Sequence, residues 1–376
     1  MKIWSKVALT VAVCTAAVAA AQGPVTVTSG KKAGEVFKNV TTSTLKELSV
    51  DDFLASMGVM SAALGFDCAD CHPGAGTDKA DFVIDSNPAK KTARRMIEMV
   101  ADINRRNFAG FQRVTCYTCH HTREVPVTTI ALDNLYASFP REDDDVVPPA
   151  TGLGRQSADQ ILDKYIEALG GAQRLAGLTS FIATGVSIGY GEFGGDGDFT
   201  IFAKAPNQRT TFITFKEHPD RGDSVWVFDG RTGWIKTPRG LLSEYELLGE
   251  ELDGARLEAQ MAFPGQIKQA LNNWRIGQRR TIGDKDYLVV QGTGPRGLLA
   301  TLYFDPQSGL LVRMVRYGPS PVGRVPTQID YSDYRDVGGI KFPFEYKFSW
   351  LDGRYTAKLK EIKTNVAIEA VKFGRP

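Results

Sequence analysis

The chain lacks the features that place a protein on nucleic acid. Among its 376 residues, Lys plus Arg number 45 and Asp plus Glu 43, so there is no strong excess of one charge. A phosphate-binding surface needs a concentrated basic field, and this balance argues against a nucleic-acid partner. After residue 21, no apolar run approaches the roughly 20 residues that a membrane-spanning helix needs. A hydrophobic content of 43% is ordinary for a globular protein and allows a sizeable core.

The first 21 residues have the pattern of a secretory signal peptide. Lys2 and Lys6 precede an apolar run over residues 7–18, and three alanines stand before Gln22. This run is too short to span a bilayer comfortably, and the alanines suit a cleavage site. Cys14 is preceded by Val13, which is bulkier than the residue that lipid-acceptor sites prefer. The sequence therefore predicts a periplasmic protein with a cleaved signal and no lipid anchor.

Cysteine is scarce, and its placement is informative. The chain has five cysteines, of which Cys14 lies in the predicted signal. The other four form two Cys-x-x-Cys-His motifs: Cys68, Cys71 and His72, then Cys116, Cys119 and His120. This motif is the attachment signature of a c-type haem. On one helical turn the residues i, i+3 and i+4 share a face, so two sulfurs and an imidazole converge on one porphyrin. The chain therefore predicts two covalently attached haem c groups.

Three other interpretations of the cysteines compete with haem: a zinc ribbon, a pair of redox-active Cys-x-x-Cys sites, and structural disulfides. Zinc ribbons commonly separate their Cys pairs by about 15–20 residues, whereas Cys71 and Cys116 lie much farther apart. A thioredoxin-like site needs a βαβ context, which the surrounding sequence does not show. None of these alternatives explains a histidine directly after both second cysteines.

Each motif follows a predicted helix that carries a pair of methionines. Ser49 as N-cap and Gly65 as terminator bound the first helix, and Asn87-Pro88 starts a second that runs to about residue 106. Apolar stripes at i, i+4, i+7 and i+11 run along both: Phe53, Met57, Met60 and Leu64, then Thr92, Met96, Met99 and Ile103. A methionine thioether can take the second axial position of a haem iron. It can equally fill a core, and the spacing leaves this open.

The stretch TARRMIEMVADIN at residues 92–104, followed by VTCYTCH at 114–120, resembles the cytochrome subunit of photosynthetic reaction centres and its smaller relatives. The resemblance covers about residues 35–130. It implies that the first methionine of each pair is the axial ligand, with Met57 opposite His72 and Met96 opposite His120. The reaction-centre subunit usually carries four haems and this chain has two motifs. The resemblance therefore implies di-haem electron transfer. The smaller number of motifs argues against a photosynthetic role.

The second half changes to a strand pattern. Residues 136–156 are acidic and proline-bearing, which is typical of a linker, and Ser157 is placed to cap a helix. Beyond it, short β-branched and aromatic runs alternate with Gly, Asp and Pro turns, with a helical interval over residues 242–274. The predicted fold is multidomain α+β: an N-terminal α-helical di-haem cytochrome c domain, then an antiparallel β-rich half-barrel with packed helices. The predicted parts are a signal peptide (1–21), a flexible lead-in (22–43), the cytochrome domain (44–135), the linker (136–156) and the β-rich domain (157–376).

The β-rich part resembles the half-barrel of periplasmic lipoprotein carriers, notably at residues 304–310 and 336–343. The resemblance implies a concave face that shelters acyl chains. The same face serves equally well to dock a partner or the haem domain, and the sequence does not choose. No constellation of catalytic residues is present in this half. Its only histidine, His218, stands beside Pro219 and is predicted to be an exposed loop residue.

Two functions follow from these features. The first is an exported di-haem electron carrier that meets redox partner proteins in the periplasm or at a membrane surface. The alternative is a periplasmic lipid- or lipoprotein-binding module with sensory or structural haems. A haem peroxidase needs an iron with an open axial position, and the methionine pairs argue against it. The sequence therefore predicts an electron-transfer protein rather than an enzyme.

Overall fold

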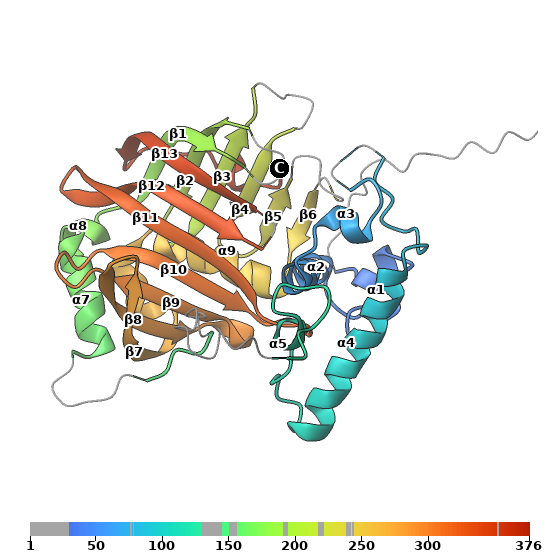
Figure 1. The fold of residues 1–376 in the computed structure, drawn as a ribbon. Helices are drawn as coiled ribbons and strands as arrows, with labels where there is room; N and C mark the ends of the chain where they lie inside the picture. Colours follow the sequence, from blue (N-terminus) through green and yellow to red (C-terminus); the bar gives the residue numbers. More distant parts are fainter. Residues whose placement is uncertain are drawn as a thin grey trace, which may run out of the picture.

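The structure is a computed structural model that describes residues 30–75, 77, 79–129, 145–149, 156–190, 195–216, 222–237, 242, 244–351 and 353–376. The predicted signal peptide, His218 and most of the predicted linker lie outside these residues. Figure 1 shows two parts side by side. We call residues 30–129 the helical unit and residues 156–376 the sheet unit. In the described residues, no helix combines the length and the apolar character needed to cross a membrane.

The described residues of the helical unit form five helices: α1 (Ala33–Val36), α2 (Val50–Leu64), α3 (Cys68–Cys71), α4 (Pro88–Asn107) and α5 (Cys116–His120). The two long helices match the predicted ones. The Ser49 hydroxyl accepts a hydrogen bond from the Asp52 amide at 3.3 Å, and Gly65 ends α2 with a φ of 69°. A Cβ atom on Gly65 would lie 2.7 Å from the Thr122 carbonyl oxygen, so glycine is needed there.

A short helix, α1, lies within residues 22–43, which the sequence predicts to be a flexible lead-in. The Ala33 amide donates to the Leu48 carbonyl at 2.8 Å, and the Gly34 amide donates to the Lys46 carbonyl at 3.0 Å. A Cβ atom on Gly34 would lie 2.9 Å from the Lys46 Cβ. Small residues thus let this segment fold back onto the start of α2. Composition alone hides this, since the segment is polar and has no periodic apolar pattern.

The sheet unit is one open antiparallel sheet of 13 strands. Its strands run β6-β5-β4-β3-β2-β1-β13-β12-β11-β10-β9-β8-β7, so the pairing of β1 with β13 joins two meanders. The strands are β1 (Ser180–Ile188), β2 (Gly197–Lys204), β3 (Gln208–Thr214), β4 (Ser224–Phe228), β5 (Gly233–Lys236), β6 (Glu244–Leu247), β7 (Asn272–Ile282), β8 (Lys285–Thr293), β9 (Leu299–Phe304), β10 (Leu311–Gly318), β11 (Val325–Val337), β12 (Ile340–Trp350) and β13 (Gly353–Thr364). The predicted α+β class is confirmed.

The helices of the sheet unit pack on the curved sheet. They are α7 (Ala158–Ala168), α8 (Ala172–Ala176), α9 (Gly249–Met261) and α10 (Ile267–Ala270). Helix α9 contacts β3, β4 and β10, which belong to different meanders, while α7 contacts β7 and β8. The main core includes Leu162 from α7, Leu257 from α9, and Phe199 and Leu302 from the sheet. Because α9 touches strands from both meanders, it lies across the hollow of the sheet.

The sequence missed three strands. The interval 242–274, expected to be helical, contains β6 and the beginning of β7, and β13 was not predicted at all. Strands β6 and β7 are the two edges of the sheet, and their residues are mostly half-exposed. Edge strands lack a continuous apolar run, so pairing with a neighbour decides their conformation. In β6 that neighbour is β5, with Gly233 opposite Leu247.

Part of the predicted linker packs onto the sheet. Val147 is 2% exposed and lies in a cluster with Val289 and Tyr303. A Cβ atom on Gly277 of β7 would lie 2.0 Å from a Val147 methyl carbon, so this glycine makes room for the valine. Residues 145–149 are therefore held to the sheet unit rather than simply spanning the gap between the two parts.

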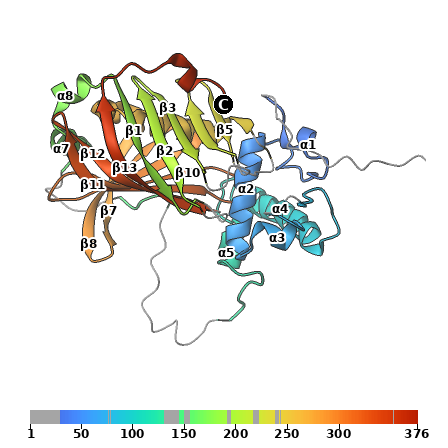
Figure 2. The same cartoon turned by 90° about the horizontal axis from the view of Figure 1, so that it is seen from above.

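Helix α2 packs against the sheet unit, as both views show (Figure 2). The start of α5 also contacts it, since the Cys116 amide donates to the Val322 carbonyl at 3.1 Å. Val322 and Val325 belong to the same buried cluster as Phe53 of α2. The tip of the β12–β13 hairpin also touches α2, where a Cβ atom on Gly58 would lie 3.3 Å from the Leu351 Cβ. Helices α7 and α8 lie at the opposite end of the sheet (Figure 1).

Candidate haem-attachment site

The second Cys-x-x-Cys-His motif forms a capped helical turn. The Thr115 hydroxyl accepts from the Thr118 amide at 3.3 Å at the start of α5. His120 Nδ1 lies 2.9 Å from the Arg123 carbonyl oxygen, a contact in which the ring nitrogen is the donor. That tautomer leaves a lone pair on Nε2, the nitrogen available to a metal. The histidine is thus oriented by a second contact, as metal-bound histidines usually are.

The first motif also forms a capped turn. The Asp67 carboxylate accepts from the amides of Ala69 at 2.7 Å and Asp70 at 3.1 Å at the start of α3. Burial and the charge of Lys90 lower the pKa of His72 to about 4. The imidazole is therefore neutral near pH 7, as ligation requires. Its Nδ1 is buried and has no hydrogen-bond partner among the described residues.

The structure bears on the alternatives for the cysteines. No disulfide joins any of the four cysteines of the motifs. Among the described residues, no three His, Cys, Asp or Glu side chains gather as ligands of one ion. The two motifs instead lie on separate helices, α3 and α5, each presenting its own set of groups. This separation fits one porphyrin at each motif.

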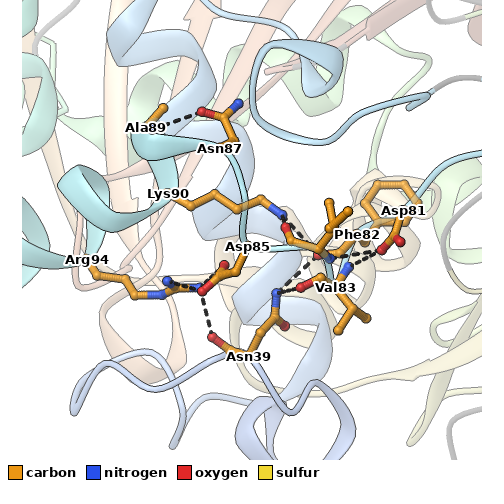
Figure 3. Close-up of polar contacts among 10 residues, drawn as sticks. Asn39, Asp81, Phe82, Val83, Asp85, Asn87, Ala89, Lys90 and Arg94 are labelled. Atoms are coloured by element: carbon orange, nitrogen blue, oxygen red, sulfur yellow. Dashed lines mark hydrogen bonds and ion pairs between the residues drawn. The ribbon is translucent and has the colours of Figure 1, made fainter.

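The chain between the first motif and α4 is held by side chains of α4, as Figure 3 shows. Lys90 is 8% exposed, and its ammonium group donates to the carbonyl oxygens of Ile84 at 2.6 Å and Phe82 at 3.2 Å. The Arg94 guanidinium pairs with both carboxylate oxygens of Asp85, at 2.7 and 2.6 Å. These contacts hold the segment that carries Phe82, whose ring centroid lies 5.1 Å from the centroid of the His72 ring.

Helix α4 reaches both motifs. At its start, the Asn87 side chain donates to the Asp70 carbonyl of α3 at 2.6 Å. Near its end, buried Asn104 donates to the Val114 carbonyl at 2.7 Å and accepts from the amides of Arg113 and Val114 at 2.9 and 3.0 Å. At 1.5 Å per residue, these two asparagines are roughly 25 Å apart along the helix. The two motifs therefore lie near opposite ends of one rigid element.

The methionines differ in their surroundings. Met57 and Met60 are half-buried against the cluster around Phe53. Met96 and Met99 are 40% and 44% exposed, because α4 buries a neighbouring face that includes Ile97 and Val100. The predicted stripe of α4 thus exists but is only partly covered by protein. A methionine pair this exposed is poorly explained as core filler.

The helical unit leaves much of its apolar surface open. Most of the exposed large apolar side chains in the described residues lie between residues 83 and 127: Val83, Ile84, Met96, Met99, Phe108, Phe111, Tyr117, Val125 and Val127. Such a concentration is unusual on a protein surface unless a ligand or partner covers it. A porphyrin is large, flat and mostly apolar, so the residues present fit this group.

The structure does not separate the two predicted repeats cleanly. Met57 lies in the same cluster as Cys116 of the second motif, and α2 packs against α5. Lys90, on the helix that carries Met96, lies beside His72 of the first motif. Helix α2, which carries Met57, therefore contacts the second motif, and α4, which carries Met96, contacts the first. The resemblance pairs the two methionines the other way round, and α4 also contacts α5. The pairing of Met57 with His72 and of Met96 with His120 stays a prediction.

These features define a protein with two Cys-x-x-Cys-His turns on a helical unit beside a curved sheet. Residues 2–138 match the family model of the photosynthetic reaction centre cytochrome c subunit. The subunit of Rubrivivax gelatinosus is 36% identical over 107 residues, which is 27% of this chain and 27% of that protein. The subunit of Thermochromatium tepidum is 34% identical over 108 residues, or 27% and 25% of the two chains. The chain thus spans about a quarter of the length of these relatives, and the predicted resemblance of this region is confirmed.

Solved structures also share features with the chain. A LolA superfamily protein from Nitrosomonas europaea covers 59% of this chain and 99% of its own, at 14% identity and a TM-score of 0.40. A putative outer membrane lipoprotein-sorting protein domain from Vibrio parahaemolyticus covers 56% and 97%, at 10% identity and a TM-score of 0.38. With TM-scores this low, these likenesses add nothing to the strand order described above.

Proposed function

We propose that the chain is an exported di-haem c-type cytochrome that transfers electrons. One haem c is attached through Cys68 and Cys71 with His72 as ligand, and the other through Cys116 and Cys119 with His120 as ligand. The observation that carries the proposal is that both motifs form capped helical turns, with His72 neutral near pH 7 and His120 oriented by its contact with the Arg123 carbonyl oxygen. A haem iron held by His and Met stores and passes one electron and is closed to substrates.

The axial methionines in this proposal are Met57 and Met96. Met96 is supported by its exposure of 40%, which is high for a core methionine. Met57 is supported by its place on α2, the helix that directly precedes the first motif. The remaining methionine of each pair, Met60 or Met99, then belongs to the apolar wall beside the porphyrin. With both axial positions filled, peroxidase chemistry is not expected.

The proposed parts are a cleaved signal at residues 1–21, a cytochrome domain at 44–135 and a β-rich domain at 157–376. Redox partner proteins in the periplasm or at a membrane surface would supply and remove electrons. For the β-rich domain we favour docking, because α2 packs on its strands and helix α9. The chain's nearly balanced net charge gives no reason to add nucleic acid to these partners.

A second candidate function for the sheet unit is binding of a lipid or lipoprotein. It is favoured by a cavity of about 70 Å³ between the sheet and its helices, with walls that include Leu178, Phe181, Phe342 and Tyr355. An apolar cavity of about 150 Å³ holds one benzene, so this one is too small for an acyl chain unless α9 moves. Lipid that co-purifies with the protein and is identified by mass spectrometry would support this candidate.

The test is to produce the full chain in a host with working cytochrome maturation. Two haems per polypeptide, retained after denaturation, are the expected result. Cys68→Ala with Cys71→Ala should leave one attached haem, and the same change at Cys116 and Cys119 should leave the other. A colourless protein, or one loaded with zinc, would refute the proposal. Spectra unchanged by carbon monoxide support His/Met ligation, whereas a five-coordinate signal supports an enzyme.

A further inference from the structure

The junction between the two units is built from carboxylates. Asp51 and Asp52, in the first turn of α2, lie at the start of α9. An Asp51 carboxylate oxygen accepts from the Leu248 amide, and Asp52 Oδ1 accepts from the Glu250 amide at 3.3 Å. A Cβ atom on Gly249 would lie 2.2 Å from an Asp52 carboxylate oxygen. The helical unit therefore presses two acidic side chains closely onto the amino-terminal end of a helix in the sheet unit.

A third acidic side chain lies buried beneath this contact. Glu250 is 4% exposed, and neither of its carboxyl oxygens has a hydrogen-bond partner among the described residues. A Cβ atom on Gly318 of β10 would lie 1.9 Å from Glu250 Oε2, so glycine is needed for this approach. Asp51 is 3% exposed, and its second oxygen also has no partner. A buried carboxylate in this state is costly unless it carries a proton.

The surrounding cations are engaged elsewhere. Arg316 of β10 pairs with Glu251 at 3.1 Å and with Glu258 at 3.4 Å, and Arg296 pairs with Asp253 at 2.7 Å. The charged groups that face the junction are Asp51 and Asp52 from α2, Glu250, Glu251, Asp253, Arg256 and Glu258 from α9, Arg209 from β3, Arg316 from β10, Arg296 from residues 295–297, and Arg324 from the chain before β11. Asp51, Asp52 and Glu250 are left without a paired cation in the described part of the chain.

We propose that this junction is a proton-operated latch, which holds α2 on α9 while Asp51 and Glu250 are protonated and loosens when they ionise. Burial, together with the charge of neighbouring Asp52, raises the pKa of Asp51 to about 7 and that of Glu250 to about 9. The docked form therefore holds protons that the opened form releases. For each proton released on opening, the equilibrium constant for docking falls tenfold per unit rise in pH.

The sign and the pH window follow from these values. An exposed carboxyl ionises near pH 4, so docking weakens from about there upward. For Asp51 the loss is complete near pH 7, and for Glu250 near pH 9. Between about pH 5 and 7, both groups weaken docking as the pH rises. Between pH 7 and 9, only Glu250 does. Because α2 also carries Met57 and Met60, the latch would govern whether that helix rests on the sheet unit.

The experiment is amide hydrogen exchange on the full-length holoprotein at pH 5.5, 6.5, 7.5 and 8.5, corrected for intrinsic exchange rates. The measured quantity is the amide exchange rate in the first turn of α2 and at the start of α9, relative to the rate in the core of β9. Wild-type opening should rise at least tenfold from pH 5.5 to 7.5. Asp51→Asn, which keeps the acceptor for the Leu248 amide, should flatten the slope below pH 7, and Glu250→Gln should flatten it above.

Glu369→Gln is the matched control, because Glu369 is an exposed carboxyl far from the junction in sequence, and it should leave the pH slope unchanged. Thermal unfolding at pH 5.5 checks that the variants fold. Opening that does not change with pH in the wild type overturns the proposal, whatever the variants do. So does a double variant, Asp51→Asn with Glu250→Gln, that keeps the wild-type slope.

Discussion

Substitution of Arg316 gives a quantitative test of the packing between α9 and the sheet. It is 1% exposed and pairs with Glu251 and Glu258, the second of which is 4% exposed. A Cβ atom on Gly254 would lie 2.3 Å from the guanidinium carbon, so the side chain fills its space closely. Arg316→Met keeps an unbranched apolar stem but removes the charge. It leaves Glu258 with Arg209 alone, at 3.4 Å.

Removing one partner of a buried ion pair costs about 3–5 kcal/mol. Because Arg209 remains, we expect a loss near the lower end, about 3 kcal/mol. At roughly 2–4 °C per kcal/mol for a unit of this size, the Tm should fall by roughly 6–12 °C. Urea unfolding followed by tryptophan fluorescence and circular dichroism measures the loss. Burial already raises the pKa of Glu258, so protonation at low pH should recover part of the stability.

Two controls separate this explanation from general damage. Arg335→Met removes an exposed arginine paired with Asp333 and should leave the stability nearly unchanged, because solvent screens such a surface pair. Adding Glu258→Gln to Arg316→Met should restore at least half of the lost stability. The reasoning is refuted if Arg316→Met costs less than about 1 kcal/mol at pH 8, or if its deficit is equal at pH 5 and pH 8.

Two further predictions concern the helical unit. Met57→Ala should let one of the two proposed haems bind carbon monoxide, whereas Met60→Ala should leave both closed; equal carbon monoxide binding by the two variants would contradict the ligand assignment. Asn104→Ala should cost about 1–3 kcal/mol and lower haem attachment at Cys116 and Cys119, because it leaves backbone groups before α5 unpaired. Asn107→Ala, at an exposed position one turn away, should do neither, as denaturant unfolding and haem content per chain would show.

Sequence alone determined the features whose signals are local. The Cys-x-x-Cys-His turns and the caps at Ser49 and Asn87 depend on contacts between residues at most four apart. Most strands between the two edges of the sheet were likewise recognisable, because their residue types are suited to a half-buried pleated surface, and β13 is the exception. Such patterns involve only a few neighbouring residues, so they can be recognised in the sequence without the structure.

Other features depended on partners far along the chain. Asn104 gives no sequence signal, although it lies on the same buried face as Ile97 and Val100 and closes the approach to α5. The edge strands β6 and β7, and the β1–β13 pairing that joins the meanders, follow from backbone groups finding neighbours rather than from apolar periodicity.

The carboxylate junction is the clearest case. Asp51 lies in the first turn of a predicted helix, and nothing in the sequence indicates that it is buried. It meets Leu248 only after folding, across 197 positions. Sequence thus determined which residues have the chemistry to attach a haem, because that chemistry is local. Tertiary structure decided which face of α4 and which acidic side chains are buried, because burial depends on the segments that the fold packs against them.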